Sequence, residues 1–383
     1  MPVGAPIDYG LLTRSILLLN DLPGVQAKVD LGPGESVGDV ALLLNLSDRG
    51  PLANYSVDID NHGSRTIGES RIGGTLRLNN MSGIGDQLVA RLQHASGNGV
   101  NSGQISYQRP VGYSGLKLGG QVSKTRYEAG KEFSGLDAQG NGVTWNLNLS
   151  YPLQRSRGAN LNLNGALEYR DLNDQQAGLT TSKNLSILTF GIDGDISDTW
   201  QGGGMTSYSL GINLGEVEND TPLAIHGGYT KLTWDVQRRQ FLNEKSSLLG
   251  KVRGQLPAQD LDSSEKLSLG GPNGVRAYPV SDSSSDSAML ASLEWHYNLG
   301  VVGYGFTLMP NVFVDYGISK LDKQSNASGN TRHLWGVGAG LMAYKPGVAQ
   351  LSLALARRGN GDVPQSTNED DRYRLWLQAV FSF

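Results

Sequence analysis

The residue types that could support catalysis are sparse in this chain and are not spaced for it. Five histidines are present: His62, His94, His226, His296 and His333. None has a partner at metal-ligand spacing, and no Gly-x-Ser-x-Gly nucleophile motif occurs. The strongest catalytic candidate is His296 beside Glu294, and an enzyme that uses this pair is the alternative. We predict instead that the protein is not an enzyme and needs no metal or cofactor.

A glycine-rich run at residues 270–274 lacks the Lys-Ser/Thr pair that a phosphate-binding loop requires. It belongs to a longer connection, about residues 258–286, whose centre reads Val275, Arg276, Ala277 and Tyr278 between serine-rich arms. An exposed loop has no need for a compact centre of glycine, arginine and aromatic residues. We therefore expect this loop to fold inward and to pack against another part of the protein.

The elements that must position this loop alternate apolar and polar residues over stretches of about ten residues. One stretch has apolar residues at every second position: Val143, Trp145, Leu147, Leu149 and Tyr151. Successive side chains of a strand point to opposite faces, so such a strand is apolar on one face only. The pattern repeats about sixteen times, with examples at 184–197 and 303–317. It predicts an all-β, antiparallel transmembrane barrel over residues 51–383, with lipid outside and water inside.

The composition fits this interpretation better than it fits a soluble protein. Only 38% of the residues are hydrophobic, which is low for the core of a 383-residue soluble chain. No apolar run reaches eighteen residues, so a membrane-spanning helix is not expected. The absence of cysteine suits passage through an oxidising periplasm. A net charge of −4 argues against nucleic acid as a partner.

The connections between the predicted strands alternate in length. Those after even-numbered strands are tight, whereas several after odd-numbered strands are long and polar, as at 130–141, 174–183, 321–332 and 359–372. Outer-membrane barrels have short periplasmic turns and longer extracellular loops. This places both the N-terminal segment and the C-terminus on the periplasmic side of the bacterial outer membrane.

Residues 1–50 do not follow the barrel pattern. Asp8 is suited to cap a helix that runs to about Asn20, and strands at 25–31 and 40–46 should follow it. A single helix and hairpin bury too little surface to be stable alone. We expect this segment to be the end of a larger module. The opening residues lack the features of a secretory signal, so we expect the chain to be part of a longer protein.

These motifs together resemble the TpsB transporters of two-partner secretion, whose superfamily also includes the barrel-assembly protein. In that family the sixth extracellular loop enters the barrel and carries a V-R-G-Y/F motif. Residues 275–278 match this motif except at Ala277, a departure that we expect to be tolerated. Phe313, Asp315 and Gly317 are similar to the family's F-x-D-x-G strand motif. Residues 1–50 resemble the end of a second POTRA domain, and a first POTRA domain is expected to precede them.

The resemblance implies that a carboxylate on a barrel strand anchors Arg276. Asp315 is the first choice and Glu294 the second. A guanidinium binds a carboxylate through two parallel hydrogen bonds, which gives orientation as well as attraction. One such pair contributes about 1–3 kcal/mol, enough to bias a loop between two positions.

The resemblance also implies a function and partners. The barrel would translocate one large β-helical exoprotein, whose secretion domain the POTRA domains bind, and the Arg276-tipped loop would gate the passage. Phe383 resembles the C-terminal signal that the barrel-assembly machinery reads; otherwise it is an ordinary interfacial aromatic residue. Outer-membrane lipids are the further partners, and a monomer is expected. A barrel-assembly factor and a passive porin remain the alternatives, and a haemolysin, an adhesin and a contact-dependent toxin are equally compatible as cargo.

Overall fold

The structure is a computed structural model of the chain. It describes residues 6–34, 36, 38–97, 99–130, 135, 137–220, 225–365 and 371–383. Parts of the predicted long connections, residues 131–134, 136 and 366–370, lie outside the described residues. None of the helices in the described residues has the length and apolar character needed to cross a bilayer.

The described residues form a closed antiparallel barrel of sixteen strands. The barrel strands are β3 (Ala53–Asp60), β4 (Arg71–Asn79), β5 (Gln87–Ala95), β6 (Val100–Pro110), β7 (Lys117–Glu128), β8 (Gln139–Arg155), β9 (Ala159–Gln176), β10 (Leu179–Asp198), β11 (Gly204–Asn219), β12 (Gly227–Phe241), β13 (Ser246–Pro257), β16 (Ser287–Tyr297), β18 (Thr307–Lys320), β19 (Thr331–Lys345), β20 (Ala349–Arg358) and β21 (Tyr373–Ser382). Neighbouring strands in the sequence pair with each other. The last strand, β21, closes the barrel by pairing residues 378–382 with residues 56–60 of β3.

The predicted all-β barrel is therefore confirmed, and most strand limits agree within a few residues. The largest differences at the start of a strand are in two strands. β10 begins at Leu179 rather than near 184, because residues 180–183 are all polar and show no alternation. β18 begins at Thr307 rather than 303, because the chain turns through Gly303–Gly305 (η4), where Tyr304 has a φ of +60°.

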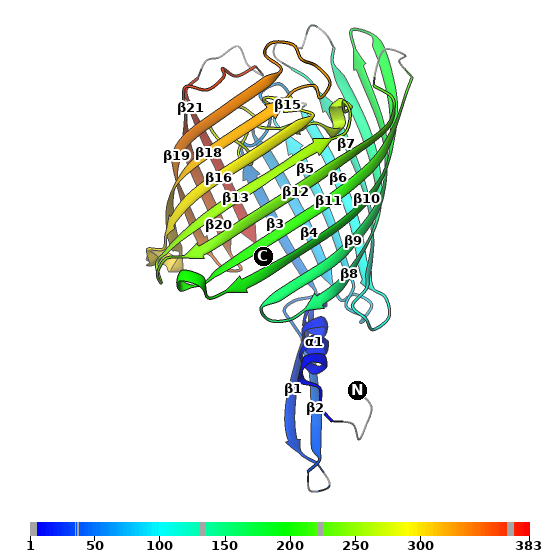
Figure 1. Cartoon of the computed structure of the whole chain (residues 1–383), viewed down its shortest axis with the longest axis vertical. Helices are drawn as coiled ribbons and strands as arrows, with labels where there is room; N and C mark the ends of the chain where they lie inside the picture. The colour runs from blue at the N-terminus through cyan, green and yellow to red at the C-terminus, as the bar shows by residue number, and fades with distance from the viewer. Residues whose placement is uncertain are drawn as a thin grey trace.

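Short elements complete the described chain. They are η2 (Trp200–Gly202), η3 (Ser263–Glu265), β14 (Leu267–Ser268), β15 (Ser284–Ser285) and β17 (Gly300–Val301). Of these, η3, β14 and β15 belong to the connection between β13 and β16, residues 258–286. Figure 1 shows β15 within the upper part of the barrel.

A small module projects from the opposite end of the barrel (Figure 1). It consists of α1 (Tyr9–Asn20) and the hairpin of β1 (Val25–Pro33) and β2 (Val40–Asp48). The Asp8 carboxylate caps α1 by accepting from the backbone N–H groups of Gly10 and Leu11 at 2.8 and 3.0 Å. Asp21, just after the helix, pairs with Arg155 on the barrel through two 2.7 Å contacts. The module is thus tied to the turn between β8 and β9.

Candidate functional site

The loop at residues 258–286 leaves β13 and packs its centre against the inner wall of the barrel. Its two arms pair through β14 and β15 and form a short stem. Beyond the stem, Val275, Ala277 and Tyr278 are almost completely inaccessible to solvent. They pack in one apolar cluster with strand residues that include Leu290, Phe313 and Leu334. The loop centre is therefore a packed part of the barrel interior.

Arg276 points from this centre to Asp315 on β18. Its Nε and Nη2 atoms lie 2.8 and 2.7 Å from the two carboxylate oxygens, and its backbone N–H also donates to Asp315 at 3.1 Å. The side chains are 12% and 2% exposed. Ser292 on β16 donates to the same carboxylate at 2.8 Å. Two parallel charge-assisted hydrogen bonds fix both the position and the orientation of the guanidinium.

Glu294 and Phe313 complete the surroundings of Arg276. Glu294 on β16 lies 3.1 Å from Nη2. The guanidinium carbon lies 3.4 Å from the centre of the Phe313 ring, in contact with its π face. Glu294 also contacts His296 at 3.0 Å, which gives this histidine a structural partner. Both predicted carboxylates thus reach the arginine, and Asp315 makes the more extensive contact.

The two small motif positions are explained by close packing. A Cβ atom at Gly317 would lie 3.0 Å from Val275 and 3.3 Å from Leu269, so any larger residue there would meet the loop. A Cβ atom at Gly336 on β19 would collide with Ala277. Alanine fits at the third motif position because the facing residue has no side chain. Gly336 was not predicted from the sequence, where it is one of 52 glycines.

Two further contacts of the loop centre were also missed. The Nε1–H of Trp376 on β21 donates to the backbone carbonyl of Arg276 at 2.7 Å. The Tyr278 hydroxyl donates to the carbonyl of Asp362 at 2.9 Å. The inward position of Trp376 on the last strand was the available signal, because an indole is an unusual residue for a polar lumen.

The base of the loop is tied together by Gln255 and Asp286. The Gln255 side chain donates to the backbone carbonyls of Glu265, Ser285 and Asp286, and so joins both arms. The Asp286 carboxylate accepts from the backbone N–H groups of Leu261 and Lys323 at 3.2 and 2.8 Å. Burial raises the pKa of Asp286 above its ordinary value, against the opposing effect of these hydrogen bonds and of Lys266.

The remaining predicted residue, Phe383, lies at the end of the chain next to the first barrel strand. It is 75% exposed, and its backbone N–H and carbonyl exchange hydrogen bonds with Tyr55 at 2.9 and 3.2 Å. Within the described residues, no group of three or more His, Asp or Glu side chains is arranged to hold a metal ion.

Comparisons with known proteins identify the family of the chain and its fold. Residues 38–343 match the family model described as haemolysin secretion/activation protein ShlB/FhaC/HecB. The chain is 28% identical to the heme/hemopexin transporter protein HuxB of Haemophilus influenzae (strain 86-028NP), over 97% of this chain and 67% of that protein. It is 26% identical to the outer membrane transporter CdiB of Dickeya dadantii (strain 3937), over 87% of this chain and 61% of that protein.

Solved structures show the same fold at lower identity. CdiB from Escherichia coli superposes with a TM-score of 0.80 at 19% identity, over 96% of this chain and 69% of that chain. BamA from Haemophilus ducreyi lacking POTRA domains 1–3 gives a TM-score of 0.62 at 14% identity, over 97% and 77% of the two chains. At these identities the likeness concerns the fold.

Proposed function

The chain belongs to the haemolysin secretion/activation family ShlB/FhaC/HecB, and from that premise we propose that its loop at residues 258–286 gates the export of a partner protein. The chain is an outer-membrane transporter of two-partner secretion and not an enzyme. In the gating proposal, the loop closes the barrel at rest. It leaves its position on β16 and β18 when an unfolded exoprotein enters from the periplasm.

The observation that carries this proposal is the position of Arg276. A buried arginine held by two carboxylates and an aromatic ring stabilises one loop position specifically, because the contacts require a fixed orientation. All of these contacts join the loop to barrel strands, and none is part of the hydrogen bonding between neighbouring strands. The loop could therefore leave its position without opening the sheet.

We assign residues 1–50 to the end of a POTRA domain that presents the partner to the barrel. The hairpin is a two-stranded sheet in the described residues, and its β2 strand exposes a row of leucines: Leu42, Leu43, Leu44 and Leu46. An extended chain can add to a sheet edge through backbone hydrogen bonds. The partner's secretion domain would bind in this way. The Asp21–Arg155 pair would keep the module below the barrel opening.

The lumen offers a path on which an extended chain would not adhere strongly. Its polar side chains bond to one another: Asn146 to Glu168, Asn148 to Asn146 and Asn162 to Asp193. These side chains already have hydrogen-bond partners, and they present few apolar contacts to a passing chain. The exoprotein would fold as a β-helix outside, and this folding would give the transport its direction. Phe383 would serve during biogenesis as the signal for the barrel-assembly machinery.

Asp315→Asn is expected to weaken the closed position of the loop without abolishing it. The substitution removes the charge but keeps the size and one acceptor oxygen, while Glu294 still faces Arg276. Losing the charge of one hydrogen-bonded pair should shift the equilibrium toward the open loop by roughly tenfold. Single-channel recording in planar bilayers measures this as a rise in open probability, and secretion of the partner should fall moderately.

The matched control for this test is Asp58→Asn. Asp58 also holds a lumen arginine, Arg91, through contacts of 2.7 and 2.9 Å, but this pair joins β3 to β5 and includes no residue of the loop. Its variant should conduct as the unaltered protein does. Equal openings in both variants, or a resting barrel that is always open as in a porin, would contradict the gating proposal.

A further inference from the structure

We infer that Glu265 is a positioning residue that anchors the first arm of the loop to strands β9 and β12, independently of Arg276. This inference rests on the proposed gating function and extends it. The arm anchor is the set formed by Asp262 and Glu265 on the loop with Arg170, Lys183 and Lys231 on the barrel wall.

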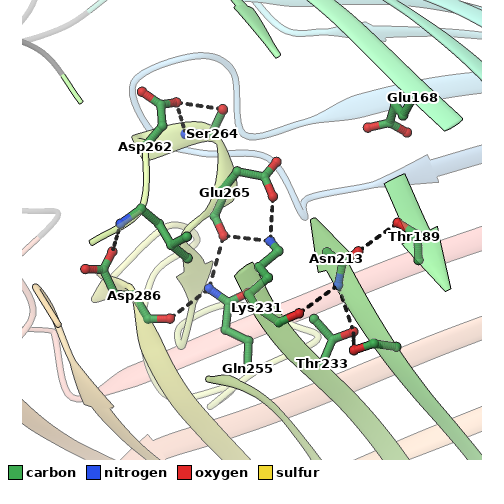
Figure 2. Close-up of polar contacts among 12 residues, drawn as sticks. Glu168, Thr189, Asn213, Lys231, Thr233, Gln255, Asp262, Ser264, Glu265 and Asp286 are labelled. Carbon is green, nitrogen blue, oxygen red and sulfur yellow. Dashed lines mark hydrogen bonds and ion pairs between the residues drawn. The ribbon is translucent and has the colours of Figure 1, made fainter. Parts of the chain in front are cut away.

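Glu265 lies between two cations from different strands. Its carboxylate oxygens are 2.7 Å from Arg170 Nη1 on β9 and 2.7 Å from Lys231 Nζ on β12. Lys231 also donates to the backbone carbonyl of Glu265 at 3.0 Å (Figure 2). The Glu265 side chain is only 3% exposed. Removing this buried charge leaves Lys231 without its carboxylate and Arg170 with Glu168 alone, which is far more costly than losing a surface ion pair.

Asp262 adds a second contact from the same arm. Its carboxylate accepts from Lys183 Nζ on β10 at 2.9 Å and from the backbone N–H of Ser264 at 2.9 Å. Burial alone would raise the pKa of Asp262, but the hydrogen bonds from Ser264 and Lys183 outweigh it and lower the pKa. Asp262 thus stays ionised while it holds the η3 turn in place, and this turn directs Glu265 to the wall (Figure 2).

Apolar packing at the same place departs from the barrel pattern. Leu185, Ile187 and Val217 are buried on the inner face of β10 and β11, where polar residues would be expected in a water-filled lumen. They pack with Tyr229 around Leu261 of the arm. At this place β10 and β11 therefore present an apolar surface to the lumen, and the loop arm packs on it. A mobile, solvated loop arm would not require an apolar contact surface on the barrel wall.

The arm anchor and the Arg276 site lie on separate parts of the wall. Arg170 is on β9 and Asp315 on β18, and β10, β11, β12, β13 and β16 lie between them in the sheet. Release of the loop centre from β18 therefore leaves the arm held on β9, β10 and β12. The loop would then pivot about Glu265 rather than detach completely, and full opening would require both anchors to release.

The test is Glu265→Gln, with Glu168→Gln as its matched control. Glu168 pairs with the same arginine, Arg170, at 2.6 Å but lies on β9, so its loss perturbs the cluster without touching the loop. The chain has no cysteine, so thiol-reactive spin labels attach only to cysteines introduced for the purpose. One label pair joins the exposed Ser284 of β15, which pairs with Ser268 of the first arm, to the exposed Arg157 of the periplasmic turn. The other joins the exposed Asn273 of the loop centre to Arg157.

Double electron–electron resonance on the full chain in detergent should separate the two anchors. Glu265→Gln should decrease the population at the arm's resting distance by roughly tenfold or more, and leave the distance from the loop centre largely unchanged. Arg276→Ala should do the reverse, and Glu168→Gln should alter neither. Unboiled gel mobility checks that each barrel is folded. If Glu265→Gln does not fold, Lys231→Gln removes one of its two cations and should release the arm to a smaller extent.

An arm distance that is unchanged in Glu265→Gln, or changed equally in Glu168→Gln, would overturn the arm anchor. Release of the arm by Arg276→Ala alone would also overturn it, because the two sites would then be one. If the arm is released as expected but conductance and secretion are unaltered, the result contradicts the gating function and leaves the arm anchor in place.

Discussion

Arg276→Ala should open the resting barrel and sharply reduce export of the partner. The substitution leaves Asp315 and Glu294 buried near each other without the cation that both contact. Removing one member of a buried ion pair typically costs about 3–5 kcal/mol, which would shift the loop toward its open position by roughly a hundredfold or more. Planar-bilayer recording should show this as frequent openings in a protein that is otherwise mostly closed.

Secretion should fall because the released loop centre remains attached through both arms and stays in the path of the partner. The amount of partner in the culture medium, relative to barrel in the outer membrane, measures this effect. Barrel insertion should be unaffected, because Arg276 lies in the loop and its contacts are not part of the pairing between barrel strands. Arg91→Ala is the matched control, because Arg91 is also a lumen arginine with a bidentate carboxylate partner. Normal secretion by Arg276→Ala would exclude the assigned role of the loop.

The barrel could be predicted from the sequence because its cause is local. Alternation of apolar and polar residues, as in Val143 to Tyr151, follows directly from strand geometry between lipid and water. Each strand carries this signal by itself. Where the signal was weak, the limits were wrong, as at the polar start of β10.

The contacts of the loop were harder to predict because they depend on which strands come together. The Arg276–Asp315 pair was expected only through resemblance to a family. Nothing in the sequence near Glu265 indicates that Arg170, 95 residues earlier, would be its partner. Leu185 and Ile187 contradict the rule of a polar lumen, and only the packed arm explains them. Lumen residues that break the alternation are therefore the sequence signal that marks where an inserted loop packs.

Gly317→Leu tests the packing of the loop separately from its charges. Any Cβ at this position would be 3.0 Å from Val275, so a leucine side chain would occupy the space of the loop centre. Overpacking of this kind costs about 1–3 kcal/mol. The nearest atoms belong to the side chains of Val275, Leu290 and Leu269 on the inner face of the wall, so the leucine should displace the loop and leave the backbone pairing of β18 intact. Bilayer recording should show openings that resemble those of Arg276→Ala, although the Arg276 and Asp315 side chains are both present.

The control for this prediction restores the space that the added side chain takes from the loop. Gly317→Ala should have a smaller effect, because only one carbon is added and its neighbours need to move by a few tenths of an ångström. Val275→Ala combined with Gly317→Ala removes the nearest methyl group and should restore the closed barrel. If Gly317→Leu stays as closed as the unaltered protein, then the loop does not rest on β18 in the membrane. If the combined variant remains open, the effect of the glycine comes from the strand itself, since relief of the crowding would have had no consequence.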